Sequence, residues 1–173
     1  MLVRYFRLGF LGGMIGGLGC FLLFFFTFLS GVMSPMVRLF DFWIPAVVTV
    51  FFIIWIKALK PKSEAFHFWE GLVYGNQIFW LTGLFSGLMI YFCTLVYPVP
   101  FENFIASSVK YLELSDKNLP DKLKMPQLDL VLKEMKETRP GFMIWDELKK
   151  KVLYSFVLVP IIAVLVRRKA IEN

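Results

Sequence analysis

The sequence has few residues for metal or disulfide chemistry: one histidine, His67, and two cysteines, Cys20 and Cys93. Structural zinc sites need several His and Cys ligands at short spacings, and no Cys-x-x-Cys pair occurs. Both cysteines lie inside apolar runs, where cysteine behaves as a small hydrophobic residue. We therefore expect no metal site, no cofactor and no disulfide framework.

Charge is missing from long stretches of the chain. No charged residue occurs between Arg7 and Arg38, or between Glu70 and Glu102. A helix needs about 20 apolar residues to cross a bilayer, and both gaps exceed that length. The chain is also 58% hydrophobic, whereas soluble domains are typically about 45–50% apolar. These features predict an all-α integral membrane protein and exclude the water-soluble fold classes.

Four apolar runs predict four transmembrane helices: about Leu8–Ser30, Leu39–Leu59, most of Gly71–Phe101, and Val152–Val166. The last run is short, because its length as a helix is roughly 22 Å against a hydrocarbon core of about 30 Å. We therefore expect the lysines at 149–151 and the basic residues at 167–169 to snorkel to the two interfaces. Asp146 and Glu147, just before the lysines, are expected to be a solvated helix start.

The segment between the third and fourth runs is the one sizeable polar part of the chain. Apolar residues at helical spacing predict two helices there, at Glu102–Leu114 and Gln127–Thr138, that pack on each other or lie on the membrane surface. The expected organisation has three parts. Residues 1–97 form transmembrane helices one to three, residues 98–148 the extramembrane helical segment, and residues 149–173 the fourth helix with a basic tail.

The formal net charge of +6 comes from basic residues that crowd around the ends of apolar runs. Such residues set orientation and contact lipid headgroups. Nucleic acid is not expected as a partner, because a basic groove with interleaved aromatic residues is absent. Four helices place both termini on one side. We expect them in the cytoplasm, with the 98–148 segment on the opposite side of the membrane.

Glycines spaced by four residues form rows on two of the predicted helices: Gly9, Gly13 and Gly17 on the first, and Gly71, Gly75, Gly83 and Gly87 on the third. Such rows let two helix backbones approach closely in a membrane. The first and third helices are therefore expected to be partners. A row that faces a different protein remains the alternative.

Polar residues inside a membrane helix are the usual pointers to function. The candidates are Glu70, Asn76 and Gln77 of the third helix, which form a possible intramembrane polar site. They can line a solute or proton path. Alternatively, Glu70 sits near a helix start, where an acidic side chain is favoured, and the two amides join helices. Asp41 is expected to pair with Arg38 at an interface.

The entry to the third helix, Phe68-Trp-Glu-Gly-Leu-Val-Tyr-Gly75, is the most distinctive motif. With the Gly-rich first helix, the amphipathic segment and the short last helix, it resembles the bacterial four-helix membrane family catalogued as domain of unknown function 4199. The resemblance implies an inner-membrane protein, often encoded near polyprenyl-phosphate glycosyltransferases. It supplies no catalytic residue.

Two functional hypotheses follow. The first is a non-enzymatic inner-membrane accessory or assembly subunit, which binds another membrane protein through its glycine rows and its external helices, or forms a homo-oligomer. A polyprenyl-phosphate glycosyltransferase is one such partner. The alternative is a small oligomeric transporter or channel that uses the polar residues of helix three. A membrane enzyme has the least support, because no nucleophile–base pair occurs and the only histidine is isolated.

Overall fold

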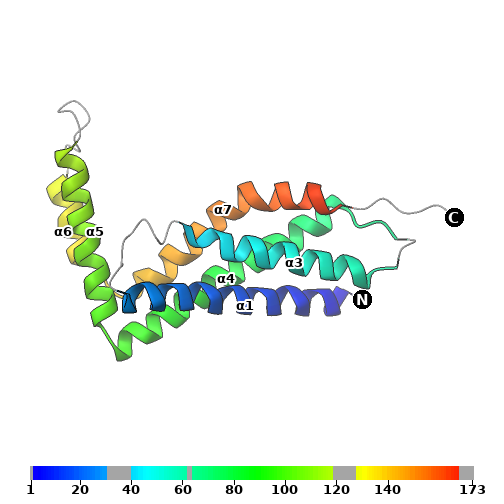
Figure 1. The fold of residues 1–173 in the computed structure, drawn as a ribbon, viewed down its shortest axis with the longest axis horizontal. Helices are drawn as coiled ribbons and strands as arrows, with labels where there is room; N and C mark the ends of the chain where they lie inside the picture. The colour runs from blue at the N-terminus through cyan, green and yellow to red at the C-terminus, as the bar shows by residue number, and fades with distance from the viewer. Residues whose placement is uncertain (1, 31–39, 62–63, 119–127, 168–173) are drawn as a thin grey trace.

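The computed structural model describes residues 2–30, 40–61, 64–118 and 128–167, and these residues are almost entirely helical. The elements in chain order are α1 (Leu2–Leu29), the 3-10 turn η1 (Phe40–Phe42), α3 (Trp43–Leu59), α4 (Phe68–Val96), α5 (Val99–Lys117), α6 (Leu128–Lys136) and α7 (Phe142–Val166). Helices α1, α3, α4 and α7 form an elongated bundle, and α5 with α6 forms an arm that crosses one end of it (Figure 1).

Helix α4 is the centre of the bundle, since it packs extensively on both α1 and α7. Helix α3 covers α1 and α4 and touches α7 less. The start of α1 and the end of α7 lie together at the end opposite the arm (Figure 1). The expected pairing of the first and third helices is therefore present as α1 against α4.

Two of the described helices are long and apolar enough to cross a membrane: α1 over Phe6–Leu29 and α4 over Phe68–Val96. Helix α3 is apolar but shorter, with 17 residues. Helix α7 has ample length at 25 residues, but its first half carries several acidic and basic residues. Length and composition thus support two of the four predicted transmembrane helices.

The structure corrects the start of the last helix. Helix α7 begins at Phe142, ahead of the predicted start at Val152, and runs without interruption across residue 148. Its length is therefore roughly 37 Å, which exceeds the hydrocarbon core. The lysine cluster lies inside this helix, so the expectation that all three lysines snorkel to an interface is wrong for Lys151, whose exposed fraction is 0%.

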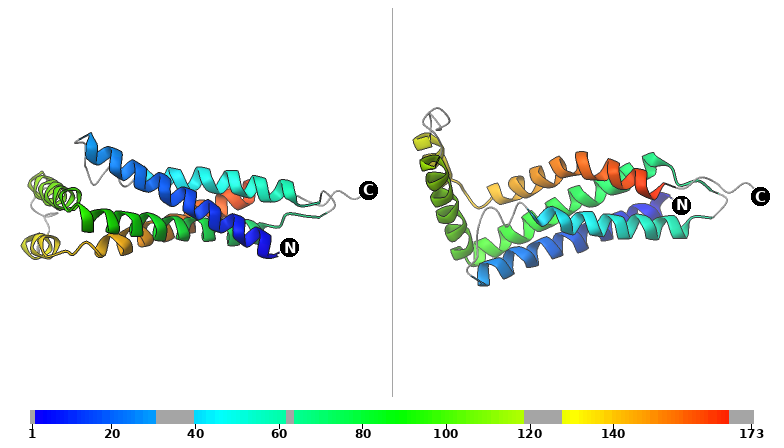
Figure 2. Two further views of the ribbon diagram at one scale, coloured as in Figure 1. Left: turned by 90° about the horizontal axis from the view of Figure 1, so that it is seen from below. Right: turned by 45° about the horizontal axis from the view of Figure 1, so that its top comes forward.

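The arm agrees with the helices predicted in the polar segment. Helix α5 extends the predicted Glu102–Leu114 by three residues at each end, and α6 lies within the predicted 127–138. The two helices pack on each other, and the left view of Figure 2 shows them nearly end-on and next to each other. Helix α5 starts just after α4 ends, because Pro98 and Pro100 suit a first turn but cannot continue α4. Mutual packing is therefore the observed use of their apolar faces.

Candidate functional site

A buried ionic cluster lies inside the bundle, on the face of α7 that meets α4. Glu147 and Lys151 are spaced by four residues, and both are almost completely buried, at 1% and 0% exposure. The same spacing continues to Ser155 and Val159, which are also buried. Residues four apart share one face of a helix, so the charged pair lies on the inward stripe of α7.

Asp41 of η1 completes the cluster from a distant part of the chain. The Lys151 ammonium lies 2.5 Å from Asp41 Oδ1 and 3.6 Å from Glu147 Oε2. The expected interface pair of Asp41 with Arg38 falls partly outside the described residues, since Arg38 is not among them. Asp41 itself is 5% exposed and lies in the bundle interior. One ammonium therefore joins carboxylates from η1 and α7.

Two glycines of α4 create the room for this cluster. A Cβ added to Gly87 would stand 2.8 Å from the Cα of Ile144, and one added to Gly83 would stand 3.1 Å from the Cβ of Lys151. No larger residue fits at either position without moving α7. The close approach brings Ser86 Oγ to 3.3 Å from Glu147 Oε2. Helix α4 thus supplies both the space and a hydrogen-bond donor.

A small cavity adjoins the cluster. Its volume is about 10 Å³, and Cys20, Asp41 and Glu147 are among the residues that line it. A cavity needs roughly 10–15 Å³ to hold one water molecule. The Cys20 thiol donates to the Asp41 carbonyl oxygen over 3.8 Å. This space therefore suits at most one small polar molecule and offers no room for a solute.

The ionic cluster has a defined physical effect. Burying charges is expensive, and a buried pair seldom stabilises a protein more than well-packed apolar residues do. Removal of one partner, however, leaves the other charge buried and costs several kcal/mol. The cluster therefore selects one arrangement of η1, α4 and α7 over alternative packings.

The predicted polar residues of the third helix lie on a different side of α4. Asn76 and Gln77 line an outward-facing groove between α1, α4 and α7, with a volume of about 830 Å³. The Asn76 amide nitrogen donates to the Leu72 carbonyl, and the Gln77 amide nitrogen donates to the Phe6 carbonyl of α1. Among the described residues, neither amide oxygen has a hydrogen-bond donor.

Glu70 serves the start of α4. Its carboxylate lies 2.7 Å and 2.9 Å from the Lys60 ammonium and accepts a hydrogen bond from the His67 backbone nitrogen. His67 and Glu70 together form the capping box of α4. The structure brings Asn76 and Gln77 together in the groove. It directs Glu70 toward Lys60 instead.

The predicted glycine rows lie at contacts within the chain. Gly9, Gly13 and Gly17 of α1 face Gln77, Leu81 and Phe85 of α4. On α4, however, Gly71 and Gly75 face Ala163 and Val159 of α7, and Gly83 and Gly87 also face α7. The α4 row therefore meets α7 rather than the first helix.

Sequence reasoning missed the ionic cluster. It treated Glu147 as part of a solvated helix start, whereas this residue is buried. The four-residue spacing of Glu147, Lys151, Ser155 and Val159 could have revealed the cluster. This spacing places the two charged residues on the same helix face as the inward-facing residues of the apolar half of α7. Among the described residues, no group of three or more His, Cys, Asp and Glu side chains could hold a metal ion.

Comparison with known proteins places the chain by family. The model of a family described as "Protein of unknown function (DUF4199)" matches residues 11–168. No curated protein and no solved structure matches the chain. The match confirms the family resemblance that the sequence motifs suggested.

Proposed function

The chain belongs to the DUF4199 family of proteins of unknown function, and we propose that it is an integral membrane protein that binds a helix of another membrane protein. In this proposal the α1, α3, α4 and α7 bundle lies in the bilayer. The protein has no reaction of its own and acts as an accessory or assembly subunit. The groove beside Asn76 and Gln77 receives the partner.

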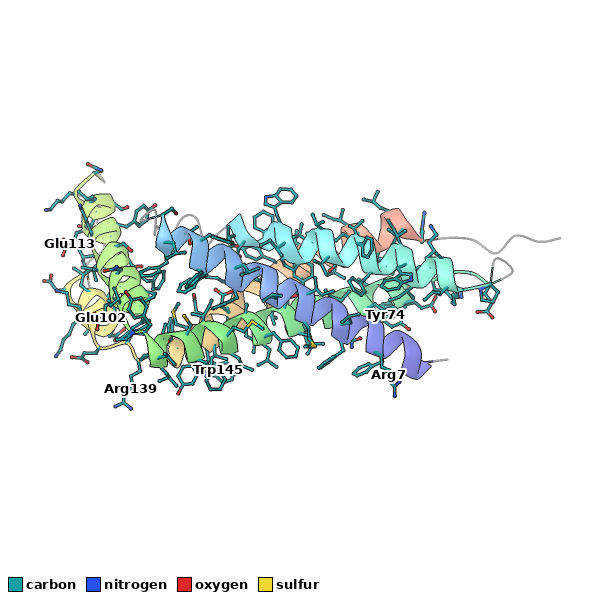
Figure 3. The ribbon with its side chains drawn as sticks, turned by 60° about the horizontal axis from the view of Figure 1, so that its bottom comes forward. Arg7, Tyr74, Glu102, Glu113, Arg139 and Trp145 are labelled. Atoms are coloured by element: carbon teal, nitrogen blue, oxygen red, sulfur yellow. The ribbon has the colours of Figure 1, made fainter. Side chains whose placement is uncertain are left out.

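The surface of the bundle supports the membrane location. Large apolar side chains are exposed along it, among them Phe51 at 61%, Trp69 at 72% and Phe156 at 66%. Soluble monomers seldom expose contiguous apolar surface on this scale. Figure 3 shows charged side chains at the two ends, with Arg7 at one end and Glu102, Glu113 and Arg139 at the arm. An apolar middle with charged ends matches the profile of a bilayer.

Basic residues support one orientation. Arg7, Lys57 and Lys60 lie near the bundle end that holds the start of α1. Positive charges close to membrane helices favour the cytoplasmic side. We therefore place the termini in the cytoplasm and the α5–α6 arm in the periplasm, in the inner membrane of a bacterium.

The groove is the observation that carries the accessory role. Its walls are mostly apolar side chains, including Phe10, Val73 and Trp80, and the polar side chains of Asn76 and Gln77 also line it. Lipid tails offer polar groups no hydrogen-bond partner, so a groove with two amide side chains suits protein better than lipid. A partner helix that packs on the groove covers these side chains and fills the apolar walls.

The transporter alternative receives less support from the geometry. Glu70 is engaged by Lys60 and by the backbone of His67. The cavity beside the buried ionic cluster measures only about 10 Å³. A path along α4 would therefore require the Glu70–Lys60 ion pair to open and the small cavity to widen.

Site-specific crosslinking tests the proposal. A photoreactive residue at Val73, in the groove, is expected to crosslink to one membrane protein in stoichiometric amount in native membranes. The same residue at Leu95, which is exposed on α4 but does not line the groove, is the matched control. A polyprenyl-phosphate glycosyltransferase is the first candidate to probe, given the family resemblance. Asn76→Leu should reduce the crosslink while the protein still inserts.

Two outcomes would contradict the proposal. Equal crosslinking from Val73 and Leu95 would show that the groove is not the contact. A crosslink to a second copy of the same chain would indicate a homo-oligomer in place of an accessory subunit, and flux assays would then test the transporter alternative.

A further inference from the structure

The base of the arm holds a second cavity, separate from the groove. Its volume is about 460 Å³, and it lies between α5, α6 and the first turns of α7. This volume falls in the lower half of the roughly 300–1,000 Å³ that is usual for small-molecule sites. Most of its wall is apolar, with Phe104, Leu112, Val131 and Met135 facing each other across the arm.

One buried hydroxyl in this wall has no hydrogen-bond partner. Ser108 is 4% exposed, and its Oγ makes no hydrogen bond among the described residues. Neighbouring hydroxyls behave differently: Ser107 donates to the Phe104 carbonyl over 3.0 Å, and Thr138 donates to the Glu134 carbonyl over 2.9 Å. Buried polar groups are nearly always paired, so an unpaired one in a cavity indicates a missing ligand atom.

The rim of the cavity sets the charge of that ligand. Asp146 and Lys150 form an ion pair of 2.6 Å, and Glu134 is an additional exposed acid. The rim therefore carries more negative than positive charge. An anionic head would meet repulsion there, whereas an uncharged head with hydroxyl or ester oxygens would not.

The position of the cavity indicates where the ligand comes from. Exposed aromatic side chains lie where α7 leaves the arm: Phe142 and Trp145, the second of which projects from the surface in Figure 3. Aromatic residues of this kind gather at the boundary between a bilayer and water. A molecule that leaves the bilayer surface can therefore enter directly.

We infer that the cavity at the base of the arm binds an uncharged single-chain lipid, such as a monoacylglycerol. Its acyl chain lies between the apolar faces of α5 and α6, and an ester or hydroxyl oxygen bonds to the Ser108 hydroxyl. This inference goes beyond the proposed accessory role and does not depend on the groove beside Asn76 and Gln77.

The test uses the full-length protein in detergent and a monopalmitoylglycerol with a photoreactive group in its chain. Crosslinked peptides are expected from α5 and α6. Val131→Trp, which fills the cavity, should abolish labelling. Leu130→Trp is the matched control, because Leu130 neighbours Val131 on α6 but is 53% exposed and does not line the cavity. If both variants lost labelling, or if both kept it, the proposed binding site would be refuted.

Two further variants test the chemistry of binding. Ser108→Ala should weaken competition by unlabelled monopalmitoylglycerol about two- to tenfold, the usual effect of one neutral hydrogen bond. Palmitate should compete poorly, and Glu134→Gln should improve its competition, whereas Glu137→Gln, just after the end of α6 and outside the cavity lining, should not. Palmitate competing as well as the uncharged lipid in the unmodified protein would overturn the proposed selectivity. Competition by a two-chain phospholipid alone would overturn the single-chain assignment.

Circular dichroism and gel filtration of each variant separate lost binding from lost folding. A Val131→Trp protein with unchanged helix content and elution but no labelling supports the site. If that variant unfolds, Ser108→Ala decides the question, because removal of one unpaired hydroxyl leaves the packing intact. Unchanged affinity of the Ser108→Ala protein would then refute the assignment. The crosslink from Val73 to a partner is scored separately, so that failure of the lipid site leaves the accessory role standing.

Discussion

The Lys151 ammonium lies 2.5 Å from Asp41 Oδ1, although the two residues are far apart in the sequence and belong to α7 and η1. Neither side chain has appreciable access to solvent, with exposed fractions of 0% for Lys151 and 5% for Asp41. This contact fixes the entry to α3 against the first half of α7. It also explains why a lysine is retained on the inward stripe of a bundle.

Lys151→Met should destabilise the protein strongly. Methionine fills a similar volume but leaves Asp41 and Glu147 buried without the ammonium, at a cost of about 3–5 kcal/mol in the free energy of unfolding. Denaturant unfolding in detergent, followed by circular dichroism, measures the change. Lys149→Met is the control, since Lys149 is exposed and should change stability by less than about 0.5 kcal/mol. Equal effects of the two substitutions would refute a special role for Lys151.

Neutralising the whole cluster should be milder than removing the lysine alone. The triple variant Asp41→Asn, Glu147→Gln, Lys151→Met retains the approximate shapes and leaves no unpaired buried charge. We expect it to be more stable than the Lys151→Met single variant, which is strong non-additivity among contacting residues. A triple variant less stable than the single variant would indicate that the carboxylates contribute independently of the lysine.

Gly87→Ala should lower stability, and Gly19→Ala should not. At Gly87 the new methyl group meets the Ile144 backbone at 2.8 Å, so α7 must shift, with a cost of about 1–3 kcal/mol. At Gly19, within the described part of the chain, the new methyl group meets only the Cγ2 methyl of Ile44, at 3.0 Å, and no backbone atom, so a small shift of one side chain relieves the contact. Alanine is the better helix former by about 1 kcal/mol, so Gly19→Ala should leave thermal stability unchanged or raise it. Matching losses at both positions would contradict the close α4–α7 contact.

Glu70→Gln should act locally. The substitution weakens the ion pair with Lys60 and the cap of α4. The two side chains of this ion pair are partly exposed, at 29% for Glu70 and 11% for Lys60. The loss in global stability should stay near or below about 1 kcal/mol. Hydrogen exchange is expected to speed up in the first turn of α4 and not near Ser86. If reconstituted vesicles show a solute flux that disappears in this variant, the transporter alternative gains over the accessory role.

Much of the helical layout could be predicted from the sequence, because uncharged runs and helical spacing are local properties. The extent of α5 and α6, and the end of α4 before Pro98, follow from such patterns. The start of α7 at Phe142 could not be predicted from local patterns. A lysine cluster before an apolar run usually marks a membrane interface, whereas here the distant Asp41, together with Glu147, pairs with Lys151 in the interior.

Some residues of the candidate sites could likewise be predicted from the sequence, and others could not. Asn76 and Gln77 stand out in the sequence because amides are costly in an apolar helix. The groove that they share with Phe10 and Phe156 depends on how α1 and α7 flank α4, which no local pattern reveals. Ser108 gave no signal, since a serine in an amphipathic helix is ordinary until its surroundings are known.

The buried charges of α7 also constrain how the chain is made. In the proposed membrane arrangement, the half of α7 that carries Glu147 and Lys151 enters the bilayer only if Asp41 and the glycines of α4 are already in place. During synthesis α7 emerges after both of those segments. This helix is therefore expected to depend on earlier ones for its integration, and α7 expressed by itself should fail to be retained by the membrane.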